Sequence, residues 1–125
     1  MRKILVVICL MLISSSAFSF SVELYREWKE EAYENEFVES GLNDRISSIY
    51  QGLLALKIVS QTNTKHYGTT ANFELWCSPG ELHLNYENLT NIIDRELVRQ
   101  GNYPEELPIA YILYYGLVHT FPCEK

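Results

Sequence analysis

The sequence of 125 residues is short of several residue types: it has three cysteines, four prolines, six glycines and fewer cations than acids. No collagen-like, heptad or short-period repeat is present, which excludes the fibrous classes. Ten Lys and Arg stand against 16 Asp and Glu, a formal net charge of −6. That balance argues against nucleic acid, whose phosphates require a clustered cationic face. Because 47% of the residues are apolar, the chain is predicted to fold, and its length fits one domain.

Motifs of catalysis are also missing. The chain has no glycine-rich phosphate loop, no serine elbow, and no Cys or His pair at zinc spacing. His66, His83 and His119 fall in three different segments, so a metal site built from them is a weak alternative. We therefore expect a binding protein without metal or cofactor, not an enzyme. Nine tyrosines fit this expectation, because tyrosine is enriched at interface hot spots.

The first 19 residues follow the pattern of a secretory signal peptide. Two cations precede an unbroken apolar run over residues 4–13, and Ala17 and Ser19 occupy the −3 and −1 positions of a cleavage site. The alternative is a membrane anchor, but a bilayer requires about 20 apolar residues. We therefore expect cleavage before Phe20 and export. The mature chain then keeps 8 cations and all 16 acids, a net charge of −8.

Cleavage also removes Cys9 and leaves two cysteines, Cys77 and Cys123. In an oxidising compartment an even pair predicts a disulfide. The alternative is a reactive thiol beside a histidine, but an oxidised cysteine is not a nucleophile and the spacing selects no histidine.

Four segments have helical periodicity. We expect a first helix over residues 21–39, capped by Ser21 and ended by Gly41, and a second from Arg45 to about Ser60, capped by Asn43 and Asp44. Gly52 within the second helix suggests the close approach of a neighbour. The six glutamates from Glu23 to Glu36 cover much of the first helix, and they form either a solvated face or a docking surface for a basic partner.

The C-terminal part contains two further helices. The third runs from a cap at Asn85 or Asn88 to Gln100, where Gly101 ends it. The fourth, residues 109–119, follows Pro108 and is apolar nearly all round, so it is either central or half buried in a partner subunit. No segment shows the two-residue alternation of a strand. The prediction is a compact all-α domain of four helices over residues 20–125.

Between the second and third helices, residues 61–80 are polar and lack a 3.6-residue period. We expect a long loop here, either functional or a plain surface connection, with its tip near His66, Tyr67 and Gly68. Residues 77–80 at its end are expected to form a turn.

Several motifs of the C-terminal half follow one another in a specific order. They are Cys77-x-Pro79, a capped helix with Leu89, Ile92, Ile93 and Leu97, then Tyr103-Pro104-Glu105, Leu107-Pro108 with Ala110, and Phe121-Pro122-Cys123. This order resembles the Rap/Tai family of amidase immunity proteins from bacterial type VI secretion systems. The resemblance covers residues 77–125 well and extends loosely to Tyr50-Gln51-Gly52. Many members have a second cysteine pair, whereas residues 20–76 here contain no cysteine.

The resemblance implies a periplasmic immunity protein that binds a peptidoglycan amidase effector and occludes its active-site groove, often as a homodimer. The amidase of such a pair has a Cys–His site. Under this interpretation Asn63, Lys65, His66 and Tyr67 are the candidate partner-binding residues of the loop. The alternatives are a periplasmic helical adaptor or oligomeric structural protein without a toxin partner, and an exported enzyme.

Overall fold

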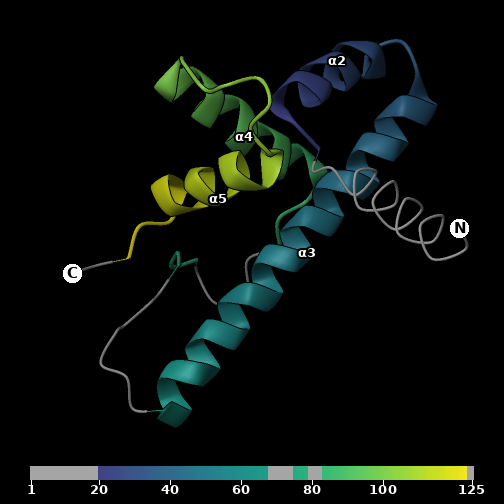
Figure 1. Cartoon of the computed structure of the whole chain (residues 1–125). Coiled ribbons are helices and arrows are strands. Elements are labelled where there is room, and N and C mark those ends of the chain that lie inside the picture. Colours follow the sequence, from purple (N-terminus) through teal and green to yellow (C-terminus); the bar gives the residue numbers. More distant parts are fainter. Residues whose placement is uncertain (1–19, 68–74, 79–82, 124–125) are drawn as a thin grey trace, which may run out of the picture.

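The computed structural model describes residues 20–67, 75–78 and 83–123, and the side chains of residues 60–67 are not among the described parts. Four α-helices make up nearly all of this portion: α2 (Val22–Ala32), α3 (Glu36–Tyr67), α4 (Tyr86–Gln100) and α5 (Ile109–Thr120) (Figure 1). The described residues form no strand, only an isolated bridge between Ser21 and Pro108. The predicted all-α class is confirmed. The expected signal peptide, residues 1–19, lies outside the described residues.

The first helix is shorter than predicted. Ser21 caps it as expected, its hydroxyl accepting a hydrogen bond from the Leu24 N–H at 3.2 Å. The helix ends at Ala32, however, so the prediction of an end at Gly41 is wrong. Asn35 is the reason, because its side-chain oxygen accepts from the Phe37 N–H and its carbonyl accepts from the Glu39 N–H. These bonds begin a new helix at Glu36.

The second predicted helix is part of a much longer one. α3 has 32 residues, about 48 Å at 1.5 Å per residue, and it includes Asn43 and Asp44, which were expected as caps. The expected loop is also wrong over residues 61–67, since these are helical, while residues 68–74 and 79–80 of it lie outside the described part. A polar sequence without Gly or Pro can extend a helix that packing has already started. Gly52 is exposed, with no atom within 4 Å of the place a Cβ would occupy, so the predicted close approach there is wrong.

The last two helices agree with the sequence. Asn85 caps α4 in a reciprocal box with Asn88, and Gly101 ends it in the left-handed conformation at φ 74°. α5 begins after Pro108 and ends one residue beyond the predicted His119. The close backbone approach is found here, because a Cβ on Gly116 would lie 2.5 Å from Cγ2 of Ile92.

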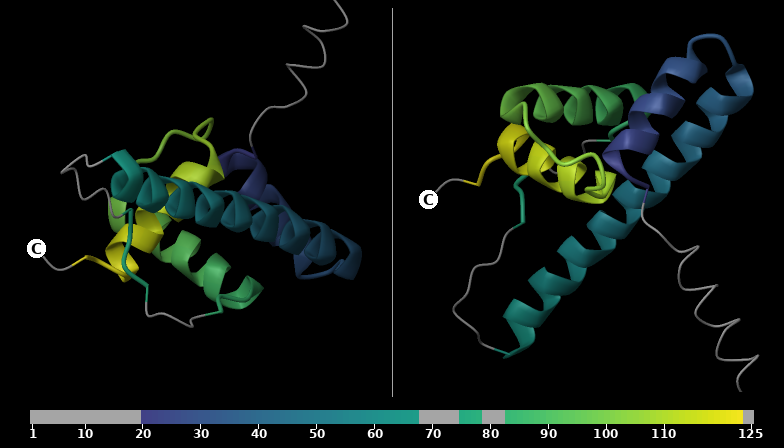
Figure 2. Two further views of the ribbon diagram at one scale, coloured as in Figure 1. Left: turned by 90° about the horizontal axis from the view of Figure 1, so that it is seen from below. Right: turned by 45° about the horizontal axis from the view of Figure 1, so that its top comes forward.

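α2 folds back along the first part of α3, and α4 and α5 lie side by side (Figures 1 and 2). The start of α2 is joined to the segment before α5 by backbone bonds, from Val22 to Leu107 and from Ile109 to Phe20. The largest side chains with less than 2% exposure come from every described helix and from the segment before α4: Trp76, Tyr25, Leu42, Ile46, Leu89, Ile93, Ile109, Ile112, Leu113 and Leu117. Among the described residues, no helix combines the length and apolar character needed to cross a bilayer.

Candidate functional site

The far end of α3, defined here as residues 56–67, extends past the other helices. Figure 1 and the right-hand view of Figure 2 show α2, α4 and α5 beside the earlier part of α3, whose C-terminal end extends beyond them. Three aliphatic side chains of this far end are more than half exposed: Leu56, Ile58 and Val59. The chain therefore presents a helical projection from a packed base.

The predicted partner-binding residues all belong to this projection. Asn63, Lys65, His66 and Tyr67 lie in the last two turns of α3, and not at the tip of a loop. Their side chains lie outside the described part of the structure. A helix holds its backbone in one conformation, so this contact element is more rigid than the predicted loop would be.

A disulfide closes the chain beside this projection. Cys77 and Cys123 are bonded, with Cα atoms 4.9 Å apart and a sequence separation of 46. The predicted bond is confirmed, and closing a loop of this length stabilises the fold by about 4 kcal/mol in the chain-entropy model. The Cys77 N–H also donates to the carbonyl of Phe121 at 2.9 Å.

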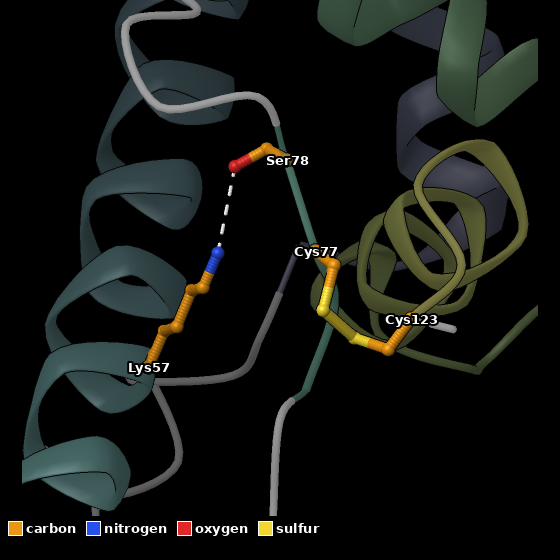
Figure 3. The surroundings of a disulfide bond; sticks show 4 residues. All are labelled: Lys57, Cys77, Ser78 and Cys123. Carbon is orange, nitrogen blue, oxygen red and sulfur yellow. Dashed lines mark hydrogen bonds between the residues drawn. A yellow bond between two sulfur atoms is a disulfide. The ribbon is translucent and has the colours of Figure 1, made fainter. Parts of the chain in front are cut away.

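Lys57 connects α3 to the disulfide segment (Figure 3). Its ammonium lies 4.9 Å from the ring centroid of the buried Trp76 and donates to the Ser78 hydroxyl at 3.4 Å. Trp76 and Ser78 flank Cys77 in sequence, so the cation lies over the residues that the disulfide holds. The base of the projection is thus attached to the part of the chain that the disulfide fixes.

Acidic and basic residues are unevenly distributed along the chain. Residues 45–67 contain Arg45, Lys57 and Lys65 and no acid. The hairpin of α2 and the start of α3, residues 21–44, contains eight acids and two cations. Of these cations, Lys57 and Lys65 belong to the far end of α3, whereas Arg45 lies over the rings of Phe20 and Trp28 beside α2.

Sequence analysis missed a second cluster, which is centred on Glu96. The side chain of Glu96 is only 2% exposed, and both of its oxygens accept hydrogen bonds. Arg99 donates to both oxygens, at 3.0 and 2.8 Å, Tyr103 donates to Oε1 at 2.8 Å, and Nδ1 of His119 lies 3.0 Å from Oε2. Together these bonds join α4, the segment after it and α5.

The Glu96 cluster borders a cavity of about 290 Å³, which Arg95, Gly116 and Thr120 also line. Hydrogen bonds from Arg99, and to a smaller extent from Tyr103 and His119, together lower the pKa of Glu96 to about 2 against the opposing effect of burial. A carboxylate this acidic is a poor general base near neutral pH. We therefore assign the cluster a structural role, which is to link α4, the segment after it and α5. The sequence carried a signal for it, since Glu96 interrupts the apolar face formed by Leu89, Ile92, Ile93 and Leu97.

The histidines are distributed as the sequence suggested, with His66 in α3, His83 before α4 and His119 in α5. Within the described ranges, no three His, Cys, Asp or Glu side chains gather in a metal-binding arrangement. Comparison with known proteins matched no family model, no curated protein and no solved structure.

Proposed function

We propose that this protein is a periplasmic immunity protein, which binds a peptidoglycan amidase effector of a type VI secretion system and occludes its active-site groove. The proposal joins the order of motifs from Cys77 to Cys123 with one structural observation. That observation is the far end of α3, a helical projection that extends past its own domain (Figure 1). An inhibitor that fills a groove needs a projecting element of this kind on a rigid base.

The base has the properties that this role requires. Its helices share one core, and a disulfide joins the segment before α4 to the end of the chain. Lys57 ties α3 to the residues beside Cys77. Because little conformational freedom is left to lose on binding, more of the contact energy remains as affinity.

The projection itself offers the chemistry of a contact. The far end of α3 combines exposed aliphatic side chains with Lys65, His66 and Tyr67 in its last turns. In our proposal these three residues enter the amidase groove and exclude the peptide crosslink from the Cys–His site. Inhibition is then steric, and this protein contributes no catalytic group and no cofactor.

The adaptor alternative was suggested by the apolar character of residues 109–120. In the structure that character is accounted for within the chain, because Ile109, Ile112, Leu113, Gly116 and Leu117 of α5 are buried against the other described segments. No separate observation favours an adaptor, and we keep the immunity proposal.

The test is an inhibition titration with the oxidised protein and a purified peptidoglycan amidase encoded beside it, following release of peptides from cell-wall material. We expect complete inhibition near equimolar protein. The triple variant Lys65→Ala/His66→Ala/Tyr67→Ala should need at least about tenfold more protein, because the loss of a central contact cluster costs more than ~1.4 kcal/mol.

A matched control carries three alanines on exposed positions of the earlier part of α3: Ser40→Ala, Asp44→Ala and Gln51→Ala. It should inhibit like the wild type. Inhibition by the Lys65/His66/Tyr67 variant at wild-type concentrations would remove these residues from the contact. An amidase that keeps full activity under saturating wild-type protein would refute the function itself.

A further inference from the structure

A groove lies at the other end of the molecule from the projection. It is a cavity of about 580 Å³ between the end of α2, the start of α3 and the start of α4. Tyr33 and Tyr86 supply rings to its lining, and Glu39 and Glu87 supply carboxylates. Its volume falls within the range of pockets that accept a ligand or a large side chain.

Large aromatic rings are exposed at this end. Tyr33 is 83% exposed and Phe37 is 87% exposed, and the two are four residues apart in sequence, on either side of the α2–α3 connection. Nothing among the described residues buries them. Exposed aromatic rings of this size are enriched in protein interfaces and cost free energy when they remain in water.

The surroundings of the groove are strongly acidic. Residues 21–44 have eight acids and two cations, so this hairpin alone has a net charge of −6, equal to that of the whole chain. Both cations already have partners outside the hairpin: Arg26 pairs with Glu105 at 3.6 Å, and Lys29 pairs with Asp94 at 3.2 Å. In the described part of the chain, no Lys, Arg or His pairs with the eight acids.

Lys29 also lines the groove, but its charge is engaged. Its ammonium binds Asp94, whose other oxygen accepts from the Tyr25 hydroxyl at 2.7 Å. The field in the groove is therefore set by the carboxylates. In agreement with this, burial raises the pKa of Tyr86, and the nearby Glu39 and Asp94 raise it further.

We propose that this groove docks a basic, amphipathic peptide segment of a partner protein, with a Lys or Arg side chain inserted between Tyr33 and Tyr86 toward Glu39 and Glu87. A cation held over aromatic rings and beside carboxylates gains both cation–π and Coulombic attraction. The exposed ring of Phe37 then covers an apolar residue of the same segment. Charge complementarity selects this occupant, because an acidic segment would be repelled by the hairpin. This proposal does not depend on binding of an amidase, because the groove and the far end of α3 are different surfaces with different partners.

The test uses the full mature protein and a fluorescein-labelled peptide of lysines interrupted by leucines, in a buffer of about 0.1 M salt. We expect saturable binding, with two-dimensional NMR shifts concentrated at Tyr33, Glu39 and Tyr86. Replacing the leucines by glycines should weaken binding, because the contact with Phe37 is lost. The variant Glu39→Gln/Glu87→Gln should weaken it by about fivefold to tenfold, the loss expected for two partly exposed charge contacts.

The matched control is Glu23→Gln/Glu106→Gln, which removes the same charge from exposed positions that do not line the groove. It should bind like the wild type. Equal weakening in the two double variants would show diffuse attraction to an acidic surface and would overturn the proposal. Shifts at the far end of α3 instead of the groove would also overturn it, as would equal binding of a glutamate–leucine peptide.

Discussion

At the scale of single residues, Glu96 is the one charged residue that is buried among those the structure describes. Its carboxylate is nearly inaccessible, and its hydrogen bonds come from Arg99, Tyr103 and His119. A buried charge is tolerated only when its lone pairs are satisfied, and here donors from α4, α5 and the segment between them supply the bonds. One side chain thereby links these two helices through hydrogen bonds.

The substitution Glu96→Gln tests this role. The variant leaves Arg99 and His119 without a charged partner, so we expect a loss of about 3 kcal/mol in the free energy of unfolding, measured by urea titration at pH 7. The exposed Glu106→Gln should change it by less than about 0.5 kcal/mol. Equal stability of the Glu96 variant and the wild type would contradict the assigned role.

The same residue predicts a pH dependence. The pKa of Glu96 is lowered from 4.5 to about 2 in the folded protein, so the unfolded state binds the proton more readily. The contribution of Glu96 to stability is therefore complete above pH 4.5 and is lost as the pH falls toward 2. Over that pH window the wild type should lose more stability than the Gln variant. Parallel plots of the free energy of unfolding against pH for the two proteins would contradict the lowered pKa.

At the scale of helices, the sequence predicted their type better than their boundaries. The ends of α4 are marked by Asn85 and Gly101, which act within one turn of the helix. Gly101 was predicted, and Asn85 was one of the two caps that the sequence allowed. The break before α3 depends on Asn35, inside a run of glutamates that looked like one continuous helix. The extension of α3 to Tyr67 depends on packing of its first half, which no local pattern of residues 61–67 reports.

Two glycines give a matched pair of predictions at this scale. A Cβ on Gly116 would meet Ile92 Cγ2 at 2.5 Å and the Ile92 carbonyl at 3.2 Å, so Gly116→Ala should separate α4 from α5 and cost about 1 to 3 kcal/mol. Gly52→Ala meets nothing and should stabilise exposed helix by about 0.5 to 1 kcal/mol. Thermal unfolding measures both, and a shift of the same sign in the two variants would contradict this packing.

At the scale of the whole molecule, two parts of the chain differ in charge. The hairpin of residues 21–44 has a net charge of −6, whereas residues 45–67 have three cations and no acid. The disulfide fixes the segment before α4, and Lys57 attaches the base of the projection to that segment. The two contact surfaces that we propose lie at opposite ends of the molecule, so a partner at one would leave the other open.

Part of the candidate site could be predicted at this scale and part could not. The disulfide followed from counting: once Cys9 is assigned to a signal peptide, only Cys77 and Cys123 remain. The groove between Tyr33 and Tyr86 joins residues more than 50 positions apart, and its walls exist only after α2 turns back along α3. No spacing in the sequence brings those two rings together.

The central claim of this account is an exported helical scaffold that one disulfide closes. It is tested most directly by mass spectrometry of the protein produced from its full gene and recovered from the periplasm, after alkylation under denaturing conditions. We predict a chain that begins at Phe20 and contains no alkylated thiol, because the expected signal peptide contains Cys9 and the two remaining sulfurs are bonded. A chain that keeps its first residues, or one with Cys77 and Cys123 both alkylated, would contradict the account.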